Sequence, residues 1–262
     1  MFLNKKEFII NYHAILIDTI LNNFYLHLKK SITMDIKILQ LLDGAKVATG
    51  LTLIIDVFRA FSTACYATGF GAKKIIPVGN IEIAYQLKGQ NPGYILIGER
   101  NEQKPAGFDF GNSPSQLLKE KIAGKTILHT TSSGTQGIAN ATNASEILTG
   151  SFVNAGAIVK YINKKQPQTV SLVCMGYACE YPTDEDTLCA EFIKNELKGI
   201  QNNFDKMVET IRNGSGARFF EHDTQNWSPQ IDFELCLALN RFNFVLKVEK
   251  DKSIDYLRKI EV

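Results

Sequence analysis

The chain has 262 residues with 45% hydrophobic and 21% charged side chains, a globular composition that excludes a largely disordered protein. Its 29 basic and 27 acidic residues give a net charge of +2, which indicates neither nucleic acid nor an anionic membrane as a partner. The five cysteines are odd in number, irregularly spaced and without a CxxC pair, which argues against a disulfide framework or structural zinc and favours a reducing cytoplasm.

The first 33 residues have apolar side chains at helical spacing, interrupted by polar ones. Their apolar runs are far shorter than the ~20 residues that a membrane span needs, and no small-residue cleavage site follows them. Met34 then opens the sequence MDIKILQLL, which looks like a natural protein start. We therefore expect residues 1–33 to be an N-terminal extension outside the main fold, and residues 34–262 to form one domain. The alternative is an amphipathic helix that packs on a partner or a surface.

From Met34 onward, short β-branched runs alternate with amphipathic stretches. The expected strands are Thr52–Val57, Lys74–Val78, Tyr94–Gly98, Thr126–Thr130, Glu146–Thr149 and Thr169–Cys174. The expected helices are Ile81–Leu87, Pro114–Glu120, Thr135–Thr142, Ala155–Asn163 and Asp186–Lys198. This alternation predicts an α/β fold, a layered α/β/α architecture with a largely parallel or mixed sheet.

After Gly199 the alternation weakens. Asn213–Ala217 is expected to be a glycine-rich loop, Asp232–Asn240 a helix and Asn243–Val248 a final strand. In folds of this class, ligands bind beyond the carboxyl ends of the strands. The polar residues that directly follow the expected strands are therefore the candidates for a functional site.

The first candidate run is IIDVFRAFST, which places Asp56 at the end of a buried strand and Arg59 three residues later. A carboxylate at this position can hold Mg²⁺, and the planar guanidinium can bind phosphate or sulfonate. The same two residues are equally typical of an internal ion pair at a strand–helix turn, so both interpretations stay open.

The second run begins with Glu99 and Arg100, directly after the expected strand Tyr94–Gly98, and continues to GFDFGNSP. Here Ser113 precedes Pro114, the usual chemistry of a helix start, where the serine caps the helix and proline fits its first turn. A helix start also presents free N–H groups to an anion. Ser113 therefore has both a structural and a functional interpretation.

The third run, HTTSSGT, gathers five hydroxyl side chains and a glycine between an expected strand and helix. Its members are Thr130, Thr131, Ser132, Ser133, Gly134 and Thr135. Hydroxyls, backbone donors and the helix dipole together suit a phosphate group, whereas the alternative is an ordinary turn. His129, which opens the run, is expected to be a strand-end residue and no catalyst.

The fourth run places three acids at Asp184, Glu185 and Asp186, before an apolar helix. They can supply magnesium ligands or a general base, but acids also favour a helix N-terminus for electrostatic reasons alone. Common phosphatase signatures are absent. Neither Cys174 nor Cys179 has arginine six positions later, no Asp-x-Asp follows a strand, and no GxxxxGK[ST] run occurs.

Taken in order, these runs resemble the 2-phosphosulfolactate phosphatase family. The resemblance extends from Met34 to Val262 and rests on IIDVFRAFST, GER, GFDFGNSP, HTTSSGT, GSFVNA and DEDTLCAEF. It implies a layered α/β fold and Mg²⁺-dependent hydrolysis of 2-phosphosulfolactate to sulfolactate and phosphate, a step of coenzyme M biosynthesis. Residues 34–262 would then be the phosphatase domain.

The resemblance also implies site residues. The expected catalytic residues are Asp56, Arg59, Arg100 and Glu185. The expected substrate-binding residues are Asn112, Ser113, Thr130, Thr131, Ser132, Ser133, Gly134 and Thr135. The expected Mg²⁺ ligands are Asp56, Glu99 and Asp186. Asp109 belongs to the same motif as Asn112 and Ser113, without an assigned role.

Two departures from the family pattern concern the substrate. Ser133 stands where the family usually has asparagine, and Ala178 and Cys179 occupy a stretch that is commonly glycine-rich. The charged residues are intact, so the sequence indicates the reaction class more strongly than the substrate. A phosphatase for another small phosphorylated hydroxy acid and a non-catalytic anion-binding protein stay open as alternatives. The expected partner is a small anionic phosphate ester, with no nucleic acid and no membrane. A homodimer is plausible, although no particular residue supports it.

Overall fold

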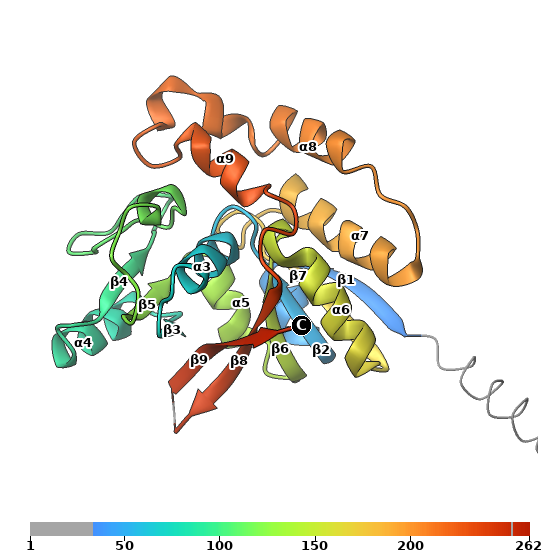
Figure 1. Ribbon diagram of the computed structural model, residues 1–262, viewed down its shortest axis with the longest axis horizontal. Coiled ribbons are helices and arrows are strands. Elements are labelled where there is room, and N and C mark those ends of the chain that lie inside the picture. Colours follow the sequence, from blue (N-terminus) through green and yellow to red (C-terminus); the bar gives the residue numbers. More distant parts are fainter. Residues whose placement is uncertain (1–33, 253) are drawn as a thin grey trace, which may run out of the picture. The chain divides into compact units, whose positions relative to one another are not determined.

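Nine strands form one mixed sheet in the residues that the structure, a computed structural model, describes, 34–252 and 254–262 (Figure 1). The strands are β1 (Asp35–Gln40), β2 (Gly50–Ile55), β3 (Lys74–Pro77), β4 (Ile95–Gly98), β5 (Thr126–Thr130), β6 (Ala144–Gly150), β7 (Thr169–Cys174), β8 (Phe244–Asp251) and β9 (Ile254–Glu261). Their order across the sheet is β1-β7-β2-β6-β8-β9-β3-β5-β4. The α/β class and the mixed, largely parallel sheet expected from the sequence are thus confirmed.

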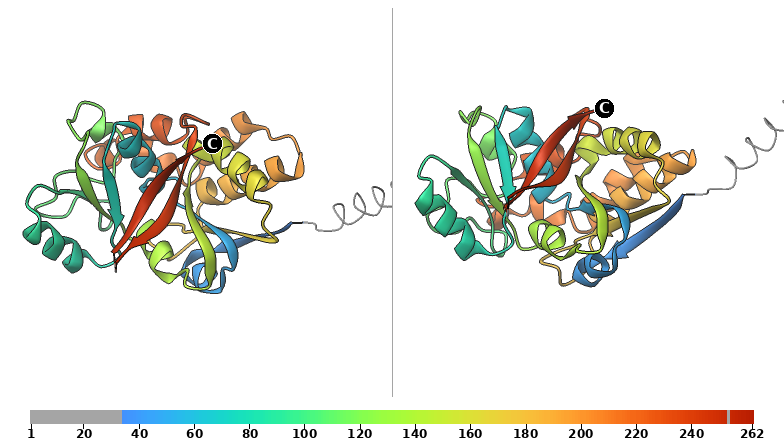
Figure 2. Two further views of the ribbon diagram at one scale, coloured as in Figure 1. Left: turned by 60° about the horizontal axis from the view of Figure 1, so that its bottom comes forward. Right: turned by 90° about the horizontal axis from the view of Figure 1, so that it is seen from below.

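Apart from β1, which lies beside β7 at one edge, the sheet consists of two parallel groups joined by an antiparallel hairpin. Strands β7, β2 and β6 form one group and β3, β5 and β4 the other. The hairpin β8–β9 lies between them, with β8 antiparallel to β6 and β9 antiparallel to β3 (Figures 1 and 2). Because each group is parallel, the carboxyl ends within it lie at the same edge, where loops of distant sequence can meet.

Strand β2 is the central strand of its group, and its sequence explains that position. It reads GLTLII, and five of its six residues are buried. Continuous apolar runs are typical of parallel strands that are covered on both faces. Ile55 pairs with Gly150 of β6 and with Cys174 of β7, so Asp56 begins the loop directly beyond three adjacent strand ends.

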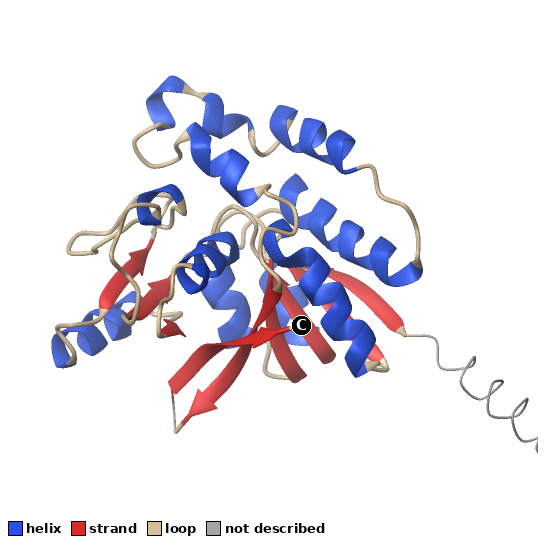
Figure 3. Ribbon diagram, viewed as in Figure 1, coloured by secondary structure: helices blue, strands red, loops and turns tan. Residues whose placement is uncertain are grey.

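Eight α-helices accompany these strands in the described residues (Figure 3). They are α2 (Leu41–Val47), α3 (Ala60–Gly69), α4 (Ile81–Gln90), α5 (Gly134–Asn140), α6 (Ala155–Lys165), α7 (Asp184–Lys198), α8 (Phe204–Asn213) and α9 (Gln230–Cys236). Helices α2 and α5 pack on each other and on the β7–β2 region, while α6 and α7 pack together and reach β8 and β7. Helix α9 packs against α3 and the 3₁₀ turns, on the side where the site loops gather.

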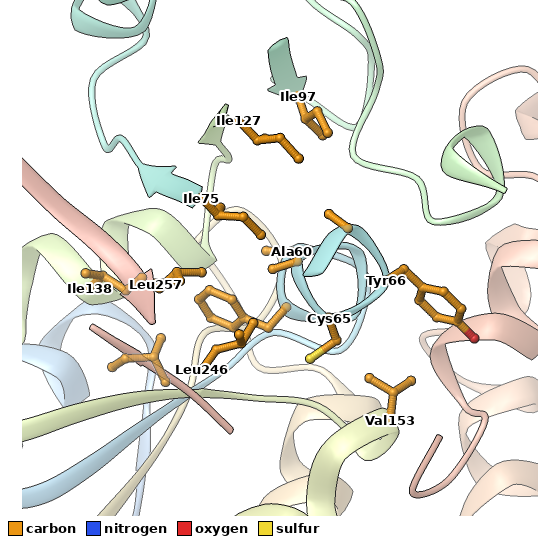
Figure 4. Packing of buried hydrophobic residues seen from close by; sticks show 14 of the residues in the cluster. Ala60, Cys65, Tyr66, Ile75, Ile97, Ile127, Ile138, Val153, Leu246 and Leu257 are labelled. Carbon is orange, nitrogen blue, oxygen red and sulfur yellow. The ribbon is translucent and has the colours of Figure 1, made fainter. Parts of the chain in front are cut away.

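Helix α3 is the core helix that follows the Asp56 loop. Its first eight residues, AFSTACYA, are all buried, and six of them are small, which lets the helix pack closely against other elements on every side. Ala60, Cys65 and Tyr66 belong to one buried cluster with Ile75, Leu246 and Leu257. Figure 4 shows Ala60 on the side of Ile75, and Cys65 and Tyr66 on the side of Val153. The loop that carries Asp56 and Arg59 is therefore anchored to the centre of the core.

Several boundaries differ from those expected. The helix expected over Pro114–Glu120 is only a 3₁₀ turn at Ser115–Leu117, and the helix expected over Asp232–Asn240 is α9, which ends at Cys236. The strand expected at Asn243–Val248 is β8 but is not the last one, because β9 follows it. The sequence analysis also missed β1, α2 and α8. Strand β9 carries four charged residues, Asp255, Arg258, Lys259 and Glu261, which hide its pattern.

The expected N-terminal extension, residues 1–33, lies outside the described residues, so its separation from the domain stays a prediction. Ile36–Val262 forms one compact unit. In the described part of the chain, no helix combines the length and the apolar character needed to cross a bilayer.

Candidate active site

A cavity of about 40 Å³ lies at the carboxyl ends of β2, β4, β5 and β7. Its walls include Asp56 after β2, Glu99 after β4, Ser132 after β5 and Tyr177 after β7. Arg218, from the segment between α8 and α9, completes the wall. Both parallel groups contribute, so the cavity lies where the two halves of the sheet converge.

Asp56 is the carboxylate at the centre of this arrangement, and it is almost fully buried. Its Oδ1 accepts a hydrogen bond from Ala60 N at 3.0 Å, and its Oδ2 accepts one from Gly134 N at 2.8 Å. Burial, together with repulsion from Glu99 and Glu185, raises the pKa of Asp56 to about 7, although the two backbone donors oppose this. The carboxylate is thus fixed in direction by the starts of α3 and α5.

Glu99 lies on the opposite group of strands and is held in the same way. Its Oε1 accepts from Ser132 N at 2.6 Å, and its Oε2 accepts from Glu102 N at 3.0 Å and from Ser132 Oγ at 3.1 Å. Ser132 therefore connects β5 to β4 through the Glu99 carboxylate. Glu99 and Ser132 both line the cavity, as the sequence suggested for this edge of the sheet.

Asp186 and Glu185, at the start of α7, are buried. Asp186 accepts hydrogen bonds from Val57 N at 2.8 Å and Gly176 N at 2.9 Å, tying the loops after β2 and β7 together. Neither acid belongs to the residues that line the cavity. Burial raises the pKa of both acids, and for Asp186 repulsion from Glu185 and Asp56 adds to the effect. Glu185 nevertheless affects the cavity, because its charge contributes to the raised pKa of Asp56.

Arg59 is a buried cavity residue with a dedicated partner. Its Nη1 donates to Asp232 Oδ2 at 2.6 Å, and Asp232, fully buried at the start of α9, also accepts from Ser115 N at 2.9 Å. Phe219 lies 5.7 Å from the guanidinium. Of the two interpretations left open for Asp56 and Arg59, the internal pair between them is not formed, because Arg59 pairs with Asp232.

Arg100 follows Glu99 in sequence but is absent from the residues that line the cavity. Its guanidinium donates to Glu99 O at 2.6 Å, to Gly79 O at 3.3 Å and to Thr130 Oγ1 at 2.8 Å. The hydroxyl of Thr130 is thereby also used inside the protein. The bond between Arg100 and Thr130 holds the end of β5 to the loop after β4. The predicted contacts of both residues with substrate stay untested.

The HTTSSGT run divides into two parts. Thr131 and Thr135 bond mainly to each other, with Thr131 N donating to Thr135 Oγ1 at 3.0 Å and Thr135 N donating to Thr131 Oγ1 at 3.2 Å. Ser132 and Ser133 instead line the cavity. Gly134 lies so close to Asp56 that an added Cβ would be 2.8 Å from its Oδ2, so only glycine permits this approach.

Asn112 and Ser113 also differ in position. Asn112 lines the cavity, and its Oδ1 lies 3.2 Å from Nε2 of His129. Burial lowers the pKa of His129 to about 4, so the ring is neutral and donates Nε2–H to this oxygen, which leaves the Asn112 amide N–H groups for a ligand. Ser113 instead interacts with Ser115, 3.0 Å between hydroxyls, and is not a lining residue. Asp109 accepts from Leu96 N and Lys88, away from the cavity.

The sequence analysis missed the contribution of the C-terminal segment. Arg218 lines the cavity, Ser215 donates a hydrogen bond to Glu185, and Asp232 holds Arg59. The glycine-rich loop expected at Asn213–Ala217 was the one signal, since such a loop permits a close approach of backbone to other groups. Gly214 and Gly216 do pack tightly, against Asp184 and Phe233.

Comparison with known proteins decides the family. A family model described as 2-phosphosulpholactate phosphatase matches residues 36–251. The chain belongs to this family. A Thermotoga maritima protein named probable 2-phosphosulfolactate phosphatase is 38% identical over 212 residues, which are 74% of this chain and 91% of the relative. A Bacillus subtilis protein of the same name is 29% identical over 213 residues, 80% of this chain and 92% of the relative.

The resemblance seen in the sequence is thus confirmed, and the chain is an enzyme of the phosphoric monoester hydrolase class. The structure also explains what the two departures from the family pattern do. Ser133 donates to Gly176 O at 2.8 Å and accepts from Cys179 N at 3.0 Å, so it holds the loop after β7. In that loop, Ala178 and Cys179 have φ of 50° and 60°, the left-handed region that favours glycine. Glycine adopts this conformation with less strain than either residue.

The carboxylates were tested for their fit to a metal ion. In residues 34–252 and 254–262, no group of three or more His, Cys, Asp and Glu side chains is arranged to hold a metal. Mg²⁺, however, is commonly bound by one or two carboxylates together with water and substrate phosphate. Asp56 and Glu99 both line the cavity, and a carboxylate oxygen that accepts one hydrogen bond keeps a further lone pair. The oxygen donors therefore suit a two-carboxylate Mg²⁺ site, with Asp186 outside the cavity wall.

Proposed function

We propose that the enzyme hydrolyses 2-phosphosulfolactate to 3-sulfolactate and phosphate in a Mg²⁺-dependent reaction. The family and the names of its relatives support the substrate. The observation that carries the metal requirement is the charge of the cavity. Its lining includes the acids Asp56, Glu99 and Glu102 but only the cations Arg59 and Arg218. A multiply charged anionic ester needs additional positive charge to enter such a site.

In this proposal, Asp56 and Glu99 would hold Mg²⁺, and the ion would supply positive charge to the phosphoryl group and acidify a bound water. The chain itself positions the ester. The Asn112 amide, oriented by neutral His129, donates toward the phosphoryl oxygens, and Arg59 presents a guanidinium held in place by Asp232. Positioning and electrostatics of this kind account for most catalysis of phosphoryl transfer.

The reaction is of the type that belongs to coenzyme M biosynthesis, and we place the enzyme in the cytoplasm. The cytoplasmic location is supported by the cysteines, which are all unpaired: Cys65, Cys174, Cys179, Cys189 and Cys236. Homodimerisation stays a prediction without a named interface.

The test is phosphate release by the full-length protein. We would assay 2-phosphosulfolactate beside a panel of phosphorylated three-carbon hydroxy acids, each with Mg²⁺ and with EDTA. We expect turnover that prefers the sulfonate ester and falls about a hundredfold or more in EDTA. Turnover of another ester alone would keep the phosphatase and replace the substrate. A folded protein that releases phosphate from none of them would indicate an anion-binding protein.

A further inference from the structure

Arg218 stands at the boundary between the cavity and a second, more open groove. The groove is lined by the loop before α7 and the 3₁₀ turn after α8, including Tyr181, Asp184 and Ser215. Arg218, Glu102 and Tyr177 line both spaces. Figure 1 shows the segment around α8 and α9, which carries this arginine, beyond the strand ends. Arg218 therefore lines the cavity from the segment between α8 and α9, whereas Asp56 and Ser132 line it from the loops after β2 and β5.

The guanidinium of Arg218 makes no hydrogen bond with the described residues, although its side chain is only 19% exposed. Its Nε lies 3.0 Å from Glu102 Oε1, but the N–H is not directed at that oxygen and stays without a hydrogen-bond acceptor. Its Nη2 lies 3.9 Å from Glu185 Oε1, beyond hydrogen-bond distance. Of the three nitrogens only Nε is buried without an acceptor, and such an atom requires an explanation because buried polar atoms are normally satisfied.

The other two arginines of the site differ. Arg59 donates to Asp232 at 2.6 Å, and Arg100 donates to three oxygen atoms of the protein. Their directions are thus set by internal partners. Arg218 is held instead by the rings of Phe58, Tyr177 and Phe219, which lie 5.3 to 5.8 Å from its guanidinium, and by the charges of two acids. The rings and the acids hold the guanidinium in place, but none of its N–H groups donates a hydrogen bond to the described residues.

We propose that Arg218 binds the sulfonate of the substrate and so determines its specificity, an inference that rests on the proposed function. Arg218 lies between Glu102 and Glu185, which repel a doubly charged phosphate more strongly than a singly charged sulfonate. Two sulfonate oxygens match the guanidinium fork, and both groups are weakly hydrated, which suits the surrounding aromatic rings. The phosphoryl group then lies at Asp56, Glu99 and Asn112.

The experiment compares two esters in two variants. Arg218→Gln removes the charge, and Arg218→Lys keeps it but removes the fork. Arg258→Gln, at an exposed ion pair on β9, is the matched control. Each protein is assayed with Mg²⁺ on 2-phosphosulfolactate and on 2-phospholactate, which has the same phosphate and carboxylate but no sulfonate. For Arg218→Gln we expect KM for the sulfonate ester to rise at least tenfold while kcat stays within twofold, with no change for 2-phospholactate. Arg218→Lys is expected to be intermediate.

An equal loss on both esters, or no loss on either, would overturn the proposal. Binding of 3-sulfolactate and of lactate is measured by calorimetry on the same proteins, so that the conclusion does not depend on turnover. If the wild type releases phosphate from neither ester, the proposed function fails. The Arg218 inference then stands if the wild type binds 3-sulfolactate and Arg218→Gln does not, and it falls if the two bind alike. Circular dichroism and thermal unfolding establish that each variant is folded.

Discussion

The strand-end loops and the C-terminal segment, residues 204–236, fix the charged side chains in and around the cavity in different ways. Asp56, Glu99 and Asp186 follow strands or begin a helix, and each accepts hydrogen bonds from two backbone N–H groups. The C-terminal segment acts through side chains, with Asp232 on Arg59 and Arg218 near Glu185. Backbone donors belong to the fold itself, whereas side-chain pairs can be removed one at a time. The two regions should therefore respond differently to substitution.

The largest effect is expected for Asp56→Asn, in the strand-end region. The substitution removes the charge that faces the substrate but keeps the shape, so we expect turnover to fall about a thousandfold, about 4 kcal/mol in the barrier. The free energy of unfolding should fall by about 1–3 kcal/mol, because both oxygens of Asp56 accept backbone N–H bonds and the Asn amide N–H₂ would leave one buried donor unpaired. Loss of a buried charge, which is costly to the fold, offsets part of this. Phosphate release and urea unfolding measure the two effects.

The control for this change is Asp43→Asn, an exposed acid on α2 that should leave both measurements unchanged. Turnover within tenfold of wild type in folded Asp56→Asn would remove Asp56 from the reaction.

The next effect tests the C-terminal region through Asp232→Ala. Removing one partner of a buried ion pair leaves Arg59 without compensation, so we expect the free energy of unfolding to fall by about 3–5 kcal/mol. Urea unfolding measures it. Glu234→Ala on the same helix removes an exposed partner of Arg212 and should cost under about 1 kcal/mol. Similar losses in the two variants would show that the buried pair has no special role in joining α9 to the site.

The smallest effect concerns His129, which orients Asn112. The pKa of His129 is lowered to about 4 by burial, from an ordinary 6.5, so between these values the unfolded chain binds a proton that the folded protein does not. Stability from this residue is therefore present above pH 6.5 and is lost as the pH falls toward 4. Between pH 7 and pH 5 the loss should be about 2 kcal/mol.

The measurement is urea unfolding at both pH values for wild type and His129→Gln, with the exposed His222→Gln as control. Asp56, Glu185 and Asp186, whose pKa values are raised, act in the opposite direction but cancel in the comparison between proteins. If wild type and His129→Gln lose stability equally on acidification, His129 is not buried in its neutral form.

Much of the strand-end region could be predicted because its signals lie in neighbouring residues of the sequence. A buried β-branched run followed by Asp56 or Glu99 gives the strand and the position of the acid, and parallel strands bring their carboxyl ends together. Within HTTSSGT the same rule does not separate the residues that line the cavity from those that bond inside the protein. Hydroxyl content does not reveal that Thr131 and Thr135 bond to each other, or that Thr130 accepts from Arg100.

By itself the sequence determined the α/β class, the strand ends that carry Asp56 and Glu99, and the family to which the chain belongs. Only the tertiary structure decided that Arg100 turns to the protein interior, that Asp232 holds Arg59 across 173 positions, and that Arg218 faces the cavity. The physical reason is the range of the forces involved. Hydrophobic periodicity and turn chemistry depend on residues that are neighbours in the sequence. The partner of a buried charge depends instead on where α8 and α9 pack.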